Sequence, residues 1–122
     1  MSDISEKLEN ILKEIKSSGD VEASVIMRRD GVVISSDLQG ISSKNLSVVS
    51  SLISVAESTS MELKRGVFQE MMIESESGKI IAINAGKNAV LLSLVKKEGN
   101  IGFVLISLES AAKNIRDIID KI

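Results

Sequence analysis

The sequence contains no cysteine, histidine, tryptophan, tyrosine or proline. These absences exclude disulfide bonds, metal sites built from cysteine or histidine, cysteine nucleophiles and histidine general bases. Carboxylates, lysine, serine and threonine are the side chains left for a catalytic role, and nothing in their spacing forms a catalytic motif. We therefore expect a protein that is not an enzyme and that has no cofactor and no metal ion.

Charge and aromatic content argue against nucleic acid as a partner. The chain has 15 basic and 17 acidic residues, a formal net charge of −2 and two phenylalanines, whereas nucleic-acid surfaces combine basic patches with stacking aromatics. The longest apolar stretches fall short of the roughly 20 residues that span a membrane. The N-terminus, MSDISEKLEN, has no apolar signal core. The sequence predicts a cytoplasmic protein without membrane insertion.

Length and hydrophobic periodicity predict one domain, residues 1–122, with eight elements. Apolar residues at helical spacing predict helices over 4–17, 42–64 and 101–122. Period-two alternation over 21–28 and an apolar run from residue 32 predict a hairpin, and glycine-bearing turns separate strands over 68–74, 79–85 and 89–95. Turns this short join antiparallel neighbours. The last two strands are almost continuously apolar, so we expect helices on both faces of the sheet.

Several residues predict where these elements begin and end. Asp3 and Glu6 form a candidate capping box, and Gly19 is a candidate stop for the first helix. The second helix has Ser42 as its candidate N-cap, and Asn100 is the candidate N-cap of the third. The remaining signals are a turn at Arg29-Asp30-Gly31, a hairpin closed by Leu38-Gln39-Gly40, and a hydrophobic staple between Ile41 and Leu46.

Residues 42–64 form the most unusual predicted helix. Its apolar side chains fill an arc of about 180°, wider than the roughly 100° stripe that docks a helix onto one sheet, so the excess predicts a second burial surface. Glu57 is the only charged residue between Asn45 and Ser60. A ridge of small serines also lies outside the apolar arc, where it either approaches a partner closely or simply faces water. The apolar residues are Leu46, Val48, Val49, Leu52, Ile53, Val55, Ala56 and Leu63, and the ridge is Ser47, Ser51, Ser54 and Ser58.

Three stretches are similar to the Roadblock family, named for dynein light chains, and the resemblance covers nearly the whole chain. The first is residues 27–37, which resemble the family's hairpin of Asp-Gly, two hydrophobic residues, a small residue and serine. The second is Ala56-Glu57-Ser58, and the third is Asn100-Ile101-Gly102 at the start of the last helix. Each stretch is typical of a fold, and none is a catalytic signature.

The resemblance implies an α+β fold of topology α-β-β-α-β-β-β-α. Its five-stranded antiparallel sheet has the order 2-1-5-4-3, with the second helix on one face and the first and third helices on the other. It further implies homodimers or paralogue heterodimers, formed through the second helix and third strand, that serve small Ras-like GTPases as platforms or regulators. The expected dimer-interface residues are Leu46, Val49, Ser50, Ile53, Phe68, Glu70, Met71, Met72 and Ile73.

The strand predicted over 68–74 supports dimerisation on physical grounds. At the margin of the sheet it presents unpaired backbone N–H and C=O groups, and residues 68–73 include no proline or lysine that would protect it. Pairing with the same strand of a two-fold mate makes one ten-stranded sheet, with Met71 and Met72 as adaptable fillers near their counterparts. The alternative is a monomer in which Glu70 and Glu74 protect the edge.

Other polar motifs have simpler explanations. Residues 84–88, NAGKN, resemble the end of a phosphate-binding loop, but Ile81 and Asn88 replace the glycine and hydroxyl residue that the motif needs, which favours a hairpin turn. Arg28 and Arg29 either contact an acidic partner or solubilise a hairpin tip. Three nearby carboxylates are best interpreted as a solvated strand surface rather than a cation or acid-base site: Glu70, Glu74 and Glu76.

The sequence predicts a non-catalytic homodimeric scaffold that docks a small Ras-like GTPase and modulates its nucleotide cycle or localisation. One alternative is a sensor of a small ligand, which requires an internal cavity with converging polar groups. The few inward polar residues count against it. The other alternative is a structural subunit of a motor or of a membrane-tethered complex, which would use the same dimer for a different client.

Overall fold

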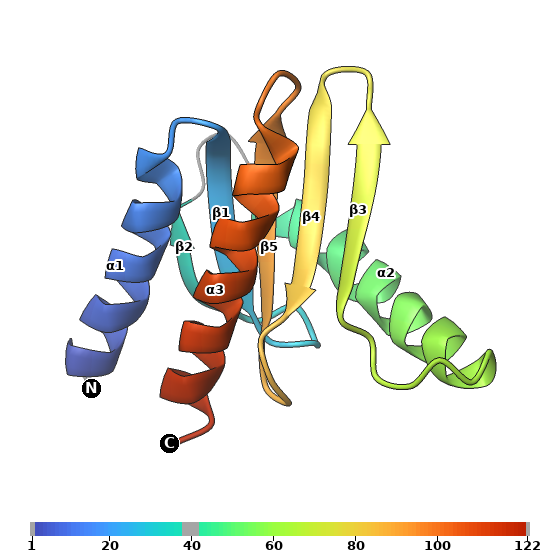
Figure 1. Cartoon of the computed structure of the whole chain (residues 1–122). Coiled ribbons are helices and arrows are strands. Elements are labelled where there is room, and N and C mark those ends of the chain that lie inside the picture. Colours follow the sequence, from blue (N-terminus) through green and yellow to red (C-terminus); the bar gives the residue numbers. More distant parts are fainter. Residues whose placement is uncertain (1, 38–41, 122) are drawn as a thin grey trace.

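The computed structural model describes residues 2–37 and 42–121. Within them, three helices and five strands follow the predicted order along the chain (Figure 1). The elements are α1 (Ser2–Ser17), β1 (Val21–Met27), β2 (Val33–Asp37), α2 (Ser43–Glu62), β3 (Glu70–Ser75), β4 (Gly78–Asn84), β5 (Val90–Lys96) and α3 (Ile101–Ile119).

The strands form one antiparallel sheet of order β2-β1-β5-β4-β3, which confirms the predicted topology. Leu92 of β5 lies between Val25 of β1 and Ala82 of β4, and Ala82 in turn lies opposite Met71 of β3. The first and last strands of this order, β2 and β3, are the two margins of the described sheet. The meander β3-β4-β5 arises because its turns are too short for anything but antiparallel neighbours.

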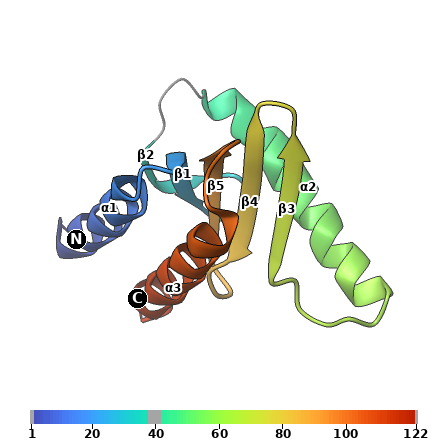
Figure 2. The ribbon, with the colours of Figure 1, turned by 45° about the horizontal axis from the view of Figure 1, so that its top comes forward.

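Helices α1 and α3 lie on one face of the sheet and α2 lies on the other (Figures 1 and 2). Each face carries its own apolar core. Leu12 of α1 and Leu108 of α3 pack with Leu91 on one face. Ile53 of α2 packs with Leu92 on the other face. Successive strand residues point to opposite faces, so a strand covered on both sides, such as β5, is apolar at most positions. The predicted sandwich, with α2 alone on its face, is confirmed.

The predicted N-caps of α2 and α3 occupy cap positions in the structure. Ser42 precedes α2, and the backbone N–H of Ser42 donates a hydrogen bond to the side-chain oxygen of Asn45 at 3.1 Å. The side chain of Asn100 accepts from the backbone N–H of Phe103 at 3.2 Å. Both bonds satisfy backbone N–H groups at a helix start, where intrahelical acceptors are missing.

The start of α1 differs from the prediction. The helix begins at Ser2, so Asp3 and Glu6 both lie inside it and the predicted capping box is wrong. Gly19 does follow the end of α1 with a φ of 87°, a conformation that glycine adopts without strain. The predicted turn at Leu38-Gln39-Gly40 and the staple residue Ile41 lie outside the described residues.

A membrane-spanning helix is absent from residues 2–37 and 42–121, because none of the helices there is long and apolar enough to cross a bilayer.

Candidate protein-docking surface

Helix α2 divides its apolar residues between the sheet and the outside. Leu46 and Ile53 are buried, and Val49 and Ala56 are half-buried against the same core. Val48 and Val55, in contrast, are 70% and 61% exposed. The prediction that the apolar arc is wider than the sheet can cover is therefore confirmed. The second surface that would cover the remainder stays a prediction.

The outer face of α2 is uncharged between residues 45 and 61 among the described side chains. Lysine and glutamate normally occupy a solvated helix face, but the exposed positions here carry serine, valine, leucine, threonine, methionine and asparagine. All four residues of the predicted ridge are exposed: Ser47, Ser51, Ser54 and Ser58. The face is thus suited to contact another protein without desolvating any charge of its own.

The structure places three of the predicted interface residues inside the chain's own core. Leu46, Ile53 and Phe68 are at most 7% exposed, so a second chain cannot reach them while this fold persists. We assign them to the core because the sheet, which sequence periodicity alone does not locate, covers that side of α2. The serine at position 50 is half-buried and donates a hydrogen bond from its hydroxyl to the backbone oxygen of Arg29 at 2.7 Å.

Strand β3 keeps the remaining predicted interface residues near the sheet margin. Met72 is 44% exposed and Glu70 is exposed, whereas Met71 and Ile73 are half-buried. Phe68 precedes the strand and packs in the α2-side core, so the strand begins two residues later than the predicted start at residue 68. Among the described strands, β3 pairs with β4 alone, which leaves its other edge available for pairing.

An open groove links the end of α2 to β3. Ala56 and Leu63 line it from the helix side, while Val67, Phe68 and Met71 line it from the loop and the strand. Figures 1 and 2 show the end of α2 extending beyond β3, outside the area of the sheet. The exposed part of α2 and the free edge of β3 therefore lie next to each other and form one continuous surface, which we call the α2–β3 surface.

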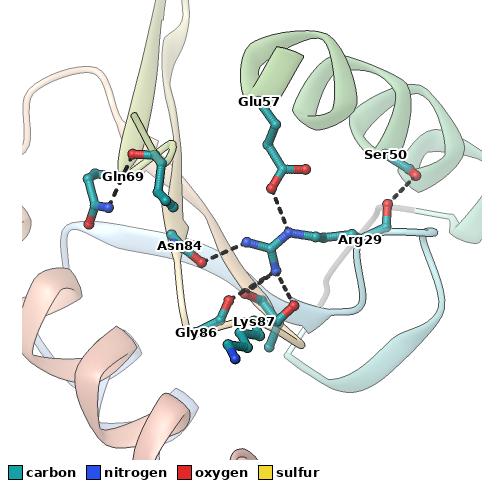
Figure 3. A network of polar contacts seen from close by, with 9 residues as sticks. Arg29, Ser50, Glu57, Gln69, Asn84, Gly86 and Lys87 are labelled. Carbon is teal, nitrogen blue, oxygen red and sulfur yellow. Dashed lines mark hydrogen bonds and ion pairs between the residues drawn. The ribbon is translucent and has the colours of Figure 1, made fainter. Parts of the chain in front are cut away.

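Arg29, in the turn between β1 and β2, joins three parts of the molecule (Figure 3). Its Nε donates to Glu57 of α2 at 2.6 Å, and one terminal nitrogen donates to the side-chain oxygen of Asn84 at 2.8 Å. The other terminal nitrogen donates to the backbone oxygens of Gly86 and Lys87 at 3.0 and 2.9 Å. Arginine's planar fork suits several acceptors at once, so this side chain fixes the distance between α2 and the β4–β5 loop.

The carboxyl groups of Glu70 in β3 and Glu109 in α3 interact with each other on the side of the sheet away from α2. A hydrogen bond with Glu109 of α3 raises the pKa of Glu70, and desolvation and the charge of Glu109 raise it further. Glu70 and Glu109 line a second groove, and Lys113 and Arg116 line it with them. In the described residues no cluster of three or more acidic side chains is placed to hold a metal ion.

The comparisons with known proteins place this fold in a family. The model of the Roadblock/LC7 domain matches residues 7–96. The chain belongs to the Roadblock/LC7 family. An uncharacterised protein of Methanocaldococcus jannaschii is 30% identical over 111 residues, which cover 89% of this chain and 96% of the relative.

Solved structures share the fold at lower identity. Myxococcus xanthus MglB superposes with a TM-score of 0.89 at 14% identity, covering 95% of this chain and 97% of that one. A Roadblock/LC7 domain from Streptomyces avermitilis superposes with a TM-score of 0.80 at 17% identity, covering 89% and 94%. At these identities the likeness establishes the fold and carries no residue roles.

Sequence reasoning missed the role of Arg29 in this Roadblock domain. The two interpretations of Arg28 and Arg29 were contact with an acidic partner and a solubilised hairpin tip, but Arg29 is turned inward and half-buried. A signal was available in Glu57, the one charged residue in an otherwise neutral stretch of α2, because it lies four residues after Ile53 and so on the same side of the helix. The segment 84–88 connects β4 to β5, as predicted, with the Ala85 N–H bonded to the Ala89 oxygen at 3.0 Å.

Proposed function

We propose that this Roadblock domain is a non-catalytic cytoplasmic scaffold that forms a homodimer and docks a small Ras-like GTPase. The neutral, partly apolar outer face of α2 next to the free edge of β3 is the observation that carries the proposal. The family resemblance supplies the class of client. A scaffold of this kind acts by binding one conformation of a two-state client more tightly than the other, since only differential affinity shifts such an equilibrium.

The proposed dimer joins the α2–β3 surfaces of two copies. Pairing of β3 with its symmetry mate would satisfy the edge ladder, and Val48, Leu52 and Val55 would lose their solvent exposure. A two-fold contact of this kind is isologous, because each copy uses the same patch. We place Val48 and Val55 in this interface instead of the buried Leu46 and Ile53.

Analytical ultracentrifugation of wild type and Val55→Asp tests the dimer. A charge forced into an apolar interface without a partner is costly, so we expect the variant to dissociate at concentrations where wild type is dimeric, with at least about a tenfold weaker affinity. Ile106→Asp is the matched control, because Ile106 is 68% exposed on the other face of the sheet. A monomeric wild type, or equal dissociation of both variants, contradicts the proposal.

The serine ridge is the proposed client contact. Affinity capture from native lysate, with the GTPase pool loaded with GTP or with GDP, should recover a Ras-like GTPase preferentially in one nucleotide state. Ser54→Arg places a long charged side chain on the ridge and should reduce recovery while leaving the dimer intact. Unchanged recovery would mean that the serines face water and take no part in docking.

The structure also bears on the sensor alternative. Ser24 and Ser93 are the buried polar side chains within the described ranges, and their hydroxyls lie 2.8 Å apart in a mutual hydrogen bond. Buried polar groups that satisfy each other are not available to recognise a ligand. This arrangement favours the scaffold over the sensor.

A further inference from the structure

Helix α2 has the fewest apolar anchors of the three helices. Two of its described side chains are buried, Leu46 and Ile53, compared with three in α1 and six in α3. Its outer valines face away from the sheet, so they do not hold the helix in place. The position of α2 on the sheet therefore depends more on polar contacts than the positions of α1 and α3 do.

These polar contacts converge on one residue. Apart from local bonds at the two ends of α2, Ser42 to Asn45 and Ser60 to the backbone oxygen of Gly66, every side-chain hydrogen bond or ion pair between α2 and the other described residues involves Arg29. Glu57 accepts from the Arg29 side chain, and the Ser50 hydroxyl donates to the Arg29 backbone oxygen. Glu57 and Ser50 lie two helical turns apart, so together they fix both the position and the rotation of α2.

The other side of the Arg29 guanidinium is held by the β4–β5 loop. Three backbone oxygens of this loop accept from one terminal nitrogen, those of Gly86, Lys87 and Ala89, at 3.0, 2.9 and 3.4 Å. Asn84, the last residue of β4, accepts from the other terminal nitrogen. With side-chain exposures of 27% and 31%, Arg29 and Glu57 form an ion pair that is shielded from water on most sides.

The structure assigns Arg29 the role of a positioning residue for the α2 docking surface. In this role Arg29 acts through α2 and not by binding the second copy or the client itself. It sets where α2 lies, and through the β4–β5 loop it links the exposed hairpin tips to that surface. This inference rests on the proposed function for its consequence, which is that losing the arginine fork weakens dimerisation by misplacing α2 while the sheet stays folded.

Arg29→Lys is the test variant, because lysine keeps the charge but cannot bond Glu57, Asn84 and the loop oxygens together. Arg28→Lys is the matched control. Arg28 is the neighbouring arginine, exposed, with its side chain paired to Asp30 within the turn at 2.6 Å. Glu57→Gln is a milder second variant that removes the ion pair and keeps the helix, should Arg29→Lys fail to fold.

The absence of cysteine allows α2 to be located directly. Spin labels on Glu62→Cys in α2 and Lys113→Cys in α3 report the distance between the two helices by pulsed electron paramagnetic resonance, with labelled protein diluted in unlabelled protein. We expect one narrow distribution in wild type and in Arg28→Lys. In Arg29→Lys the distribution should broaden or shift, and in Glu57→Gln it should do so to a smaller extent.

Dimer dissociation constants of the same unlabelled variants complete the experiment. We expect Arg29→Lys to weaken the dimer by about tenfold and Arg28→Lys to leave it unchanged. An unaltered distance distribution in folded Arg29→Lys overturns the inference, even if the melting temperature falls, because stability alone is not positioning. A monomeric wild type overturns the dimer proposal instead, while the distance measurement still decides whether Arg29 positions α2.

Discussion

At the scale of the residue, internal pairing is what keeps the outer face of α2 neutral. Glu57 is the single charge in the middle of this helix, and its carboxylate is turned toward Arg29 and away from the outer face. A partner that approaches α2 therefore meets hydroxyl and methyl groups, and docking there does not require removing water from a charged side chain, which is costly.

Glu70 leads to a prediction about pH. The hydrogen bond with Glu109, the desolvation of Glu70 and the negative charge of Glu109 raise the pKa of Glu70 above the ordinary value of 4.5. A carboxyl whose pKa is raised by folding contributes stability that is complete below its unfolded-state pKa and is lost as pH rises through the folded-state pKa. Glu70→Gln removes the repulsion between the carboxylates of Glu70 and Glu109, so it should raise the melting temperature at neutral pH. The gain should shrink toward zero below pH 4.5, where the Glu70 carboxyl is protonated.

Thermal melts of Glu70→Gln and Glu74→Gln, from neutral pH to below pH 4.5, test whether Glu109 raises the pKa of Glu70. Glu74→Gln removes the same charge from an exposed position of the same strand, so it controls for the change in net charge. Equal pH profiles for the two variants would show that Glu109 has no special effect on Glu70.

At the scale of the element, one helix carries two different apolar surfaces. The side of α2 with Leu46 and Ile53 belongs to the core, and the side with Val48 and Val55 is exposed. Helical periodicity places all four residues in one wide arc. The division within that arc is made by the sheet, which covers only part of it, and by Arg29, which sets the rotation of the helix.

Ile53→Ala tests whether Ile53 belongs to the core. Removing a buried isoleucine side chain leaves a cavity, so the free energy of unfolding should fall by about 2 to 5 kcal/mol. The same substitution at the exposed Ile106 of α3 should change it by less than about 0.5 kcal/mol. Denaturant unfolding of both variants gives the comparison, and similar losses would return Ile53 to a surface role.

At the scale of the whole molecule, the sheet has two margins of different character. Strand β2 ends beside α1, where Lys16 and Asp37 lie 3.6 Å apart in an ion pair. Strand β3 lies beside the protruding end of α2. An exposed edge and an exposed apolar helix face that adjoin each other are both expected at a surface that pairs with another chain.

The proposed dimer should respond weakly to salt. Its contact surface is uncharged along the middle of α2, so screening of charges has little to act on. Raising NaCl from about 50 mM to about 500 mM shortens the Debye length severalfold, yet the dissociation constant of the wild-type dimer should change by less than about threefold. A steep dependence, measured by sedimentation, would point to an interface built from the charged faces instead.

Local patterns in the sequence determined much of this fold. Period-two alternation, glycine-bearing turns and helical stripes are properties of short segments, so the order of the eight elements and the N-cap positions of Ser42 and Asn100 could be predicted. The strand order and the layers of helices came from the resemblance carried by residues 27–37 and two shorter stretches. The neutral character of the outer face of α2 was also visible, because the absence of charge is a property of the sequence itself.

Only the tertiary structure decided which side of each element is covered. Ile53 and Val55 are both apolar and two positions apart, yet one is buried and the other is 61% exposed, because burial depends on where the sheet lies. Arg29 and Gly86 are 57 residues apart in the chain, and no local pattern predicts that they meet. Contacts between distant residues form when the cores close, so the core assignment of Ile53 and the position of α2 followed from the fold.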